Sequence, residues 1–193
     1  MITSKKPARP RAAPKRPSAP AGARAPAEHV LRSFAPERHD HRRCVNAALR
    51  KADATCSASG LRLTPLRRRV LELVWGSHTP VKAYDLLATL GKERDQAAPP
   101  TVYRALDFLL EAGLVHRLAS LNAFVGCGEP GPGHTGQFLI CTSCGKVAEL
   151  AEPRLSETIA ASAARLGFEV RHETIEIEGL CGECRQDPSG QPS

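Results

Sequence analysis

The sequence has no run of about 18 apolar residues, so we expect no membrane-spanning helix. Its basic N-terminus lacks the apolar segment of a secretory signal, and six prolines among the first 26 residues would break the amphipathic helix of a transit peptide. We therefore expect a cytoplasmic protein. The sequence also lacks a nucleophile elbow, a phosphate-binding loop and a His-Glu-x-x-His motif. We expect that it is not an enzyme and has no small-molecule substrate; the alternative is a metal-dependent hydrolase with Glu149 as general base.

Positive charge is concentrated at the N-terminus. Residues 1–43 carry eleven Lys and Arg against three Asp and Glu, with few large apolar side chains. This Pro- and Ala-rich composition predicts a disordered basic tail, and we expect a second disordered tail at 186–193. Between the tails, residues 44–120 have a net charge of +4 and residues 121–193 a net charge of −5. Such a division suits a protein with one half facing a polyanion.

The segment 44–126 has the pattern of short helices followed by a β-hairpin. We expect helices at 46–59, at 65–75 after the N-cap Thr64, at 83–90, and from about Thr101 to the stop at Gly113. The third would turn Tyr84, Leu87 and Ala88 to one side. The last has its core-facing positions three and four residues apart: Val102, Ala105, Leu106, Leu109 and Leu110. Strand-like stretches at 114–119 and 123–127 then complete the order of a winged helix.

Polar side chains on this predicted domain are candidates for DNA contact. Thr101, Tyr103 and Arg104 are the candidates on the helix that begins near Thr101. Tyr103 and Arg104 lie outside its apolar face, where they would reach the major groove. Arg67, Arg68 and Arg69 would be available for phosphates. An exposed Tyr-Arg pair can equally be a solvated helix face, but the order of elements and the local positive charge favour the DNA-binding interpretation.

The segment 127–185 predicts a small α/β dimerisation domain, so the whole fold class is α+β. Strands are expected at 138–141 and 146–150, a helix at 154–166 and a further alternating strand at 168–178. On the helix, one face would carry Leu155, Ile159, Ala163 and Leu166. A domain of this size cannot bury both faces of its sheet alone, so we expect a homodimer.

Two Cys-x-x-Cys pairs dominate the chemistry of this second segment. They comprise Cys141, Cys144, Cys181 and Cys184, which together supply the four thiolates of a closed tetrahedral zinc site. A redox pair is disfavoured because such motifs come singly, near a βαβ unit. A constitutive zinc-ribbon module remains as a second alternative. Elsewhere, His39, His41 and Cys44 form a possible cluster with nothing nearby to impose a geometry. We assign no metal role to His78 or His172, and Cys56 is interpreted as an ordinary thiol.

The stretch PPTVYRALDFLLEAGLVHR (99–117), followed by the two Cys-x-x-Cys pairs, resembles the ferric uptake regulator family, and most closely its zinc-sensing branch. The resemblance covers about residues 46–185. It implies a homodimeric repressor that binds double-stranded operator DNA when its sensing site holds metal. The four cysteines would be its structural zinc site. Tyr103 and Arg104 would be its major-groove contacts.

The same resemblance implies a second, sensing zinc site at His116, Cys127, His134 and Glu149, which gives two Zn²⁺ per chain. The iron sensors of the family carry a His-His-x-His run before the first Cys pair, whereas here His134 stands alone. One thiolate, two imidazoles and a carboxylate suit zinc better than iron or manganese. Control of zinc uptake genes is therefore the expected function, with sensing of iron, manganese or nickel as the alternative.

Overall fold

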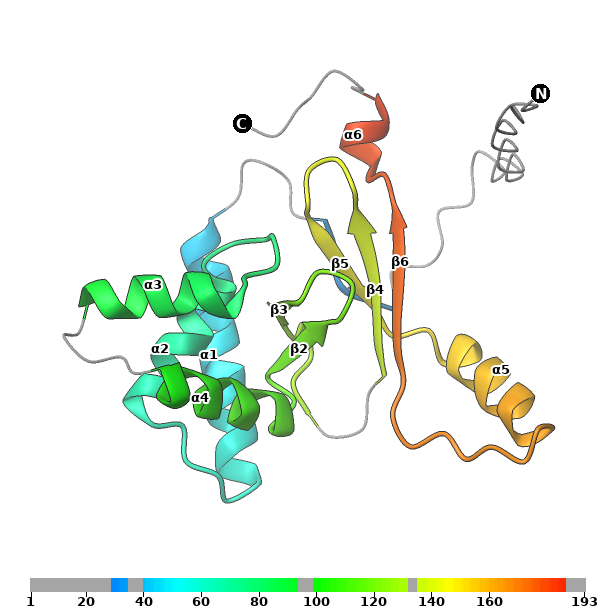
Figure 1. Ribbon diagram of the computed structural model, residues 1–193, viewed down its shortest axis with the longest axis horizontal. Coiled ribbons are helices and arrows are strands. Elements are labelled where there is room, and N and C mark those ends of the chain that lie inside the picture. Colours follow the sequence, from blue (N-terminus) through cyan, green and yellow to red (C-terminus); the bar gives the residue numbers. More distant parts are fainter. Residues whose placement is uncertain (1–28, 35–39, 94–98, 132–134, 187–193) are drawn as a thin grey trace, which may run out of the picture.

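The computed structural model describes residues 29–34, 40–93, 99–131 and 135–186. Four helices lie on one side of the described molecule and a sheet with two further helices on the other, with a β-hairpin between them (Figure 1). The helices are α1 (His41–Ala58), α2 (Pro65–Trp75), α3 (Ala83–Glu93) and α4 (Pro99–Glu111). The predicted α+β class is confirmed. No helix within the described residues is long and apolar enough to cross a membrane.

The boundaries of α2 and α4 follow from their sequence. The side chain of Thr64 accepts a hydrogen bond from the backbone N–H of Arg67, and Pro65 occupies the first turn of α2. Gly113 ends the α4 segment with a φ of +65°, a conformation that glycine adopts without strain. Four of the five core positions predicted for α4 are fully buried, and Leu110 is partly buried against the same core.

The predicted grouping of Tyr84, Leu87 and Ala88 on one side of α3 does not mark its main buried face, since only Leu87 of the three packs, partly buried, against the helical core. Leu86 and Leu90 are buried, whereas the side chain of Tyr84 is 78% exposed. Leu86 and Leu90 are one helical turn apart and so share a face, and they bury two large aliphatic side chains. The face with Tyr84 offers a smaller apolar surface beside a phenol hydroxyl, so it faces solvent.

The hairpin of β2 (Val115–Leu118) and β3 (Ala123–Gly126) lies between two hydrophobic cores. Val115 and Phe124 pack into the core of the four helices. Leu118 and Val125 pack instead against Phe138 and its neighbours on the sheet. Every residue of β3 is buried, because both faces of the hairpin are covered. The predicted domain boundary at 127 therefore directly follows a segment that both halves share.

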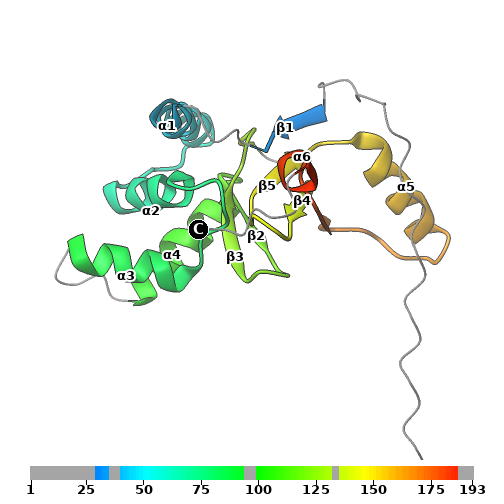
Figure 2. The ribbon, with the colours of Figure 1, turned by 90° about the horizontal axis from the view of Figure 1, so that it is seen from above.

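The sheet has the strand order β1-β5-β4-β6 and is seen from above in Figure 2. Its central hairpin is β4 (Gly136–Cys141) and β5 (Val147–Leu150), which run antiparallel. β6 (Thr174–Gly179) pairs parallel to β4, and α6 (Gly182–Gln186) follows it. The crossover from β5 to β6 contains α5 (Pro153–Ala164).

Strand β1 (Val30–Arg32) corrects the prediction that residues 1–43 form a disordered tail, because it pairs antiparallel with β5. α1 also begins inside this stretch, at His41. A strand of three residues is too short to show an alternating pattern, and its hydrogen bonds come from the exposed edge of β5. Residues 1–28, 35–39 and 187–193 lie outside the described part of the chain.

The strand predicted at 168–178 is longer than the strand in the structure. β6 begins only at Thr174, because its partner strand begins at Gly136, which is the residue paired with Thr174. Within the described residues, the expected apolar face of α5 is only partly covered. No residue of α5 is fully buried, and the side chains of Leu166 and Phe168 just after it are 86% and 65% exposed.

One carboxylate ties the hairpin to the sheet. Glu176 on β6 accepts hydrogen bonds from the backbone N–H groups of Ala119 (2.7 Å) and Ser120 (3.1 Å), and from the Ser120 hydroxyl. Burial alone would raise the pKa of Glu176, but these three hydrogen bonds outweigh it and lower the pKa. Stabilisation from this contact is therefore complete above the ordinary glutamate pKa of about 4.3, and is lost as the pH falls through the lowered value.

We expect Glu176→Gln to lower the free energy of unfolding by about 1 kcal/mol, because the amide keeps one acceptor but loses the charge and the second oxygen. The thermal midpoint at neutral pH should fall by a few degrees. The matched control is Glu178→Gln, the same chemical change at an exposed position on the same strand. Equal midpoints for the two variants would show that the contact contributes nothing to stability.

Candidate metal centres and nucleic-acid interface

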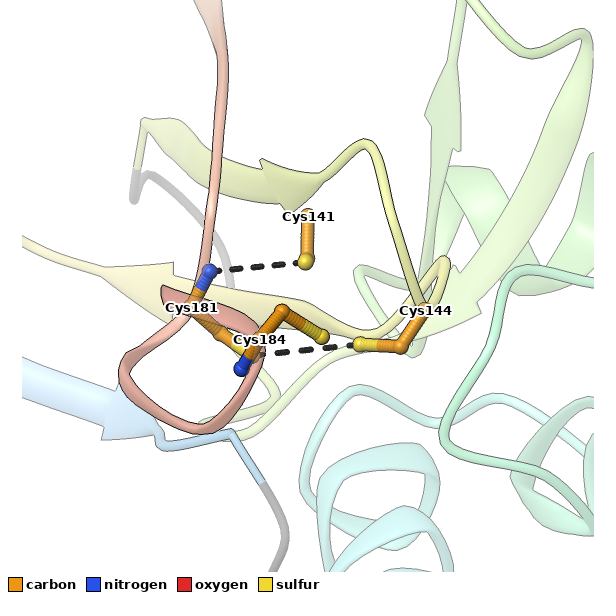
Figure 3. A group of neighbouring side chains, drawn as sticks. All are labelled: Cys141, Cys144, Cys181 and Cys184. Atoms are coloured by element: carbon orange, nitrogen blue, oxygen red, sulfur yellow. Dashed lines mark hydrogen bonds between the residues drawn. The ribbon is translucent and has the colours of Figure 1, made fainter. Parts of the chain in front are cut away.

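The four predicted thiolates come together at one end of the sheet. Cys141 is the last residue of β4 and Cys144 follows in the turn to β5, while Cys181 precedes α6 and Cys184 lies within it. The parallel pairing of β4 with β6 ends at Cys141 and Gly179, which delivers the second pair of cysteines to the first. All four Sγ atoms lie within 4.8 Å of one another (Figure 3).

The backbone around this cluster favours thiolates. The N–H of Cys181 donates to the Sγ of Cys141 (3.4 Å), and the N–H of Cys184 donates to the Sγ of Cys181 (3.5 Å). Burial would raise the pKa of Cys141, but N–H donors of Cys144, Cys181 and Ser143 outweigh it and lower the pKa to about 6. Burial and the adjacent thiols raise the pKa of Cys144 to about 12. A dication would remove this conflict by taking all four as thiolates, and four sulfurs leave it no open position.

Three of the predicted sensing residues form a second cluster, beside the hairpin. His116 lies on β2, Cys127 directly follows β3 and Glu149 lies on β5. Their ligand atoms are within 4.8 Å of one another. The Nε2 of His116 is 3.0 Å from Oε1 of Glu149, and the same oxygen is 3.7 Å from the Sγ of Cys127. An imidazole, a thiol and a carboxylate at this spacing are a zinc-type donor set.

The carboxylate of this cluster is fully buried and firmly oriented. Its Oε2 accepts a hydrogen bond of 2.7 Å from the backbone N–H of Gly128, which leaves Oε1 directed at His116 and Cys127. A Cβ at Gly128 would lie 2.6 Å from the backbone oxygen of Leu31 and 3.2 Å from Oε2 of Glu149. Only glycine therefore allows β1 and the carboxylate to approach the chain this closely.

The ionisable groups of the second cluster, Cys127 and Glu149, suit the binding of a cation. Burial and the neighbouring Glu149 raise the pKa of Cys127 well above its usual range, so its thiol is protonated at neutral pH and would release a proton on binding metal. Arg32 on β1 donates to the carbonyl oxygens of Gly126 (3.3 Å) and Val147 (3.4 Å) and interacts electrostatically with Glu149. Sequence reasoning missed Arg32, because no pattern marks a strand in the tail.

The fourth predicted ligand, His134, lies outside the described residues. Gly131 and Thr135, the described residues on either side of that gap, line one cavity together with His116. The role of His134 stays a prediction.

The predicted DNA-contacting side chains of α4 lie at its surface. Thr101 and Arg104 are exposed and Tyr103 is 49% exposed, while Val102 and Ala105 between them are buried. The helix therefore presents one polar edge to solvent near its N-terminal end. Nothing within the described protein covers this edge.

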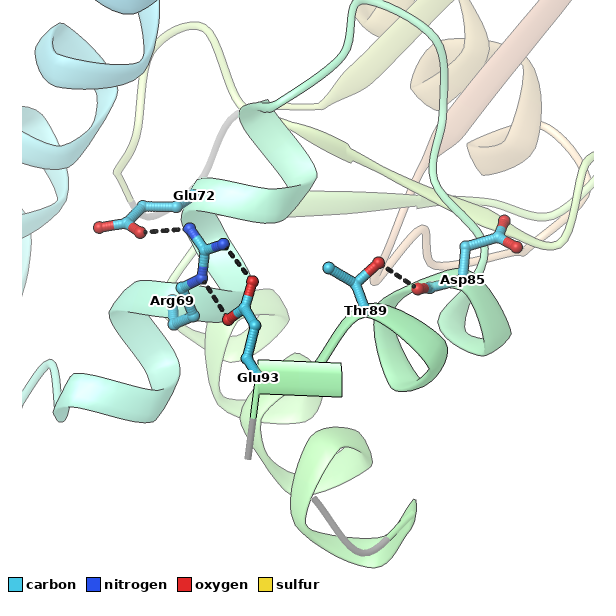
Figure 4. A network of polar contacts seen from close by, with 5 residues as sticks. All are labelled: Arg69, Glu72, Asp85, Thr89 and Glu93. Atoms are coloured by element: carbon cyan, nitrogen blue, oxygen red, sulfur yellow. Dashed lines mark hydrogen bonds and ion pairs between the residues drawn. The ribbon is translucent and has the colours of Figure 1, made fainter. Parts of the chain in front are cut away.

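The arginines of α2 are engaged within the protein. Arg67 stacks on the ring of Phe108, with Cζ 3.5 Å from the ring centroid, and donates to the carbonyl oxygen of Arg62 (2.7 Å). Arg68 forms an ion pair with Asp53. Arg69 is held by Glu72 and Glu93 (Figure 4), which raise its pKa above the usual arginine value. Phosphate contacts by Arg67 and Arg68 stay a prediction. They would use guanidinium N–H groups that do not already donate to the partners named above.

Comparison with known proteins gives consistent matches. The model of the ferric uptake regulator family matches residues 58–178. The zinc uptake regulation protein of Escherichia coli K12 is 44% identical over 137 residues, which are 70% of this chain and 80% of that protein. A zinc uptake regulator solved in complex with zinc and DNA has a TM-score of 0.70 at 40% identity, covering 76% of this chain and 98% of that one. The crystal structure of holo XcZur gives 0.68 at 45% identity, covering 73% and 99%.

Proposed function

This chain belongs to the ferric uptake regulator family, and we propose that it is a zinc-responsive transcriptional repressor that controls zinc uptake genes. The observation that carries the proposal is the cluster of His116, Cys127 and Glu149, whose donor atoms lie within 4.8 Å of one another beside the hairpin that both cores share. In this proposal the protein is not an enzyme. It would act in the cytoplasm, where its partner is operator DNA.

Zinc is the proposed effector because the cluster contains a thiol. Iron(II) and manganese prefer oxygen and nitrogen ligands, whereas zinc accepts thiolate, imidazole and carboxylate together. The relatives at 40–45% identity are named as zinc uptake regulators, which supports the same metal here. The alternative within the family is a sensor of iron, manganese or nickel.

The proposed site would couple metal to the orientation of the two halves. His116 and Cys127 belong to the hairpin, and Glu149 belongs to the sheet. An ion held by all three, with His134 as the fourth ligand, would fix the angle between the helices that meet DNA and the sheet.

A homodimer completes the proposal. β6 and the segment after α5 expose large apolar side chains that nothing in the described chain covers: Leu166, Phe168, Ile177 and Leu180. A second copy placed on this side would bury them and present two α4 helices to half-sites about one helical turn apart.

We expect two zinc ions per chain to differ in how easily they are removed. The four-cysteine site is closed by four soft ligands, so its ion should resist a mild chelator, while the ion at His116, Cys127 and Glu149 should leave. Zinc counted per chain before and after chelation, together with DNA binding, measures this. Binding to operator DNA should be lost in step with the removable ion only.

We expect Arg104→Ala to weaken specific DNA binding by about 1 to 3 kcal/mol if the guanidinium contacts a base edge. The probe is a duplex selected by the zinc-loaded protein from a random pool, with binding followed by fluorescence anisotropy. Arg154→Ala, at an exposed arginine on α5, is the matched control for loss of positive charge. A base contact also predicts relaxed sequence preference at one position, which a phosphate contact does not.

A further inference from the structure

Two histidines outside both metal centres face each other in the helical half. His41 is the first residue of α1, and His78 lies in the connection between α2 and α3. The Nδ1 of His41 is 3.0 Å from the Nε2 of His78. The ring centroids are 4.6 Å apart, and the ring planes are inclined by 69°. Two ring nitrogens from segments 37 residues apart therefore converge on one point.

This geometry is close to that of two ligands of one ion. Nitrogens bound to a tetrahedral zinc at 2.0–2.1 Å are about 3.3 Å from each other, only a few tenths of an ångström beyond the observed separation. Without an ion, one imidazole donates its N–H to the other. With an ion, both nitrogens direct lone pairs to it, and the rings need to move apart only slightly.

A cavity lies beside this pair of histidines. Cys44 lies one helical turn after His41 and lines a cavity of about 340 Å³ together with His78. The sulfur of Cys44 does not form a three-ligand group with the two imidazoles. The two imidazole nitrogens are themselves ligands of the type that zinc and neighbouring transition metals bind. The cations on the same cavity are directed at backbone oxygens: Lys51 donates to Gly128 (2.8 Å), and Arg32 to Gly126 and Val147.

We propose that His41 and His78 form a third divalent-metal site, which binds Zn²⁺ more weakly than the other two centres. The ion would tie the start of α1 to the connection after α2, and so stabilise the helical half when zinc is abundant. His41 precedes the residues 58–178 that match the family model. Neither histidine belongs to the proposed sensing cluster, although Cys127 of that cluster lines the same cavity as His78.

The test titrates zinc into the full-length protein carrying Cys127→Ala, with the four-cysteine site intact. Calorimetry with Zn²⁺, and absorption spectroscopy with Co²⁺, should detect one weak equivalent per chain that disappears when His78→Ala is added. His29→Ala, at the histidine that directly precedes β1, should leave this equivalent unchanged. Identical zinc equivalents with and without His78→Ala would overturn the proposal.

A second variant separates metal binding from a simple hydrogen bond. His78→Gln can still hydrogen-bond to His41 but is a poor ligand. It should therefore lose the weak equivalent while keeping the thermal midpoint measured before zinc is added, with the four-cysteine site filled. If it keeps the equivalent, His78 is not a ligand. Failure of the sensing assignment would appear differently, as zinc-dependent DNA binding that survives Cys127→Ala alone.

Discussion

Cys144→Ser should prevent stable folding of the sheet and the C-terminal helix. The four sulfurs join the β4–β5 hairpin to the segment of α6. The same two parts also meet through an ion pair between Lys146 and Glu183 and a hydrogen bond from the N–H of Cys181 to the Sγ of Cys141. Binding of structural zinc supplies on the order of 10 kcal/mol or more of folding free energy. This is as large as the whole stability of a typical domain, so a site with three thiolates and a hydroxyl should not hold the fold together.

Three measurements check this result: zinc per chain, thermal unfolding followed by circular dichroism, and molecular mass in solution. The variant should contain less than one tightly held zinc and should not form a stable dimer. Cys56→Ala is the matched control, because it removes a buried thiol from α1 at a cost of about 1 kcal/mol without touching either cluster. A zinc-free Cys144→Ser dimer with an unchanged midpoint would show that the cluster is not structural.

The four-cysteine site could be predicted fully because its information is local. Each Cys-x-x-Cys pair places two thiolates on one turn, and the spacing is diagnostic whatever the fold between the pairs. The core-facing positions of α4 were likewise readable, since a period of 3.6 residues depends only on the helix itself. For such elements, the local sequence pattern and the tertiary structure favour the same residues at the same positions.

The cluster at His116, Cys127 and Glu149 is different in kind. Its residues are separated by 11 and 22 positions, and a lone histidine or glutamate on a strand carries no local signal. Only the resemblance to a family placed them together, and the structure brings these three within ligand distance of one another. Arg32 and the pairing of His41 with His78 could not be found in this way, because they depend on how separate segments pack.

Strand edges account for most of the remaining errors. β1 exists because β5 offers an unpaired edge, and β6 starts where β4 starts. Neither feature can be predicted from the residues of β1 or β6 alone. The same applies to α5, whose apolar residues look like a core-facing stripe although the described part of the chain buries none of them fully. Long-range pairing, or a second copy of the chain, decides these cases.

Cys127→Ala and Glu149→Gln should each abolish the zinc dependence of DNA binding while leaving the four-cysteine zinc in place. Cys127 supplies the thiolate, and Glu149 supplies a buried charge whose second oxygen is fixed by the N–H of Gly128. Gln has nearly the same shape as Glu but cannot provide the negative charge. The gain in operator affinity on adding zinc, expected to be about 5- to 150-fold in the unmodified protein, should fall to near one.

Thermodynamic linkage between zinc binding and DNA binding provides a second, independent test of this prediction. Coupling between two sites is reciprocal, so operator DNA must tighten zinc binding by the same factor by which zinc tightens DNA binding. The unmodified protein should show this equality in titrations of zinc with and without the duplex, and Cys56→Ala should match it. If either Cys127→Ala or Glu149→Gln retains the full zinc response in both directions, the sensing ion is not held by this cluster. Loss of both responses together, with one resistant zinc still bound, would place the switch at the hairpin between the two cores.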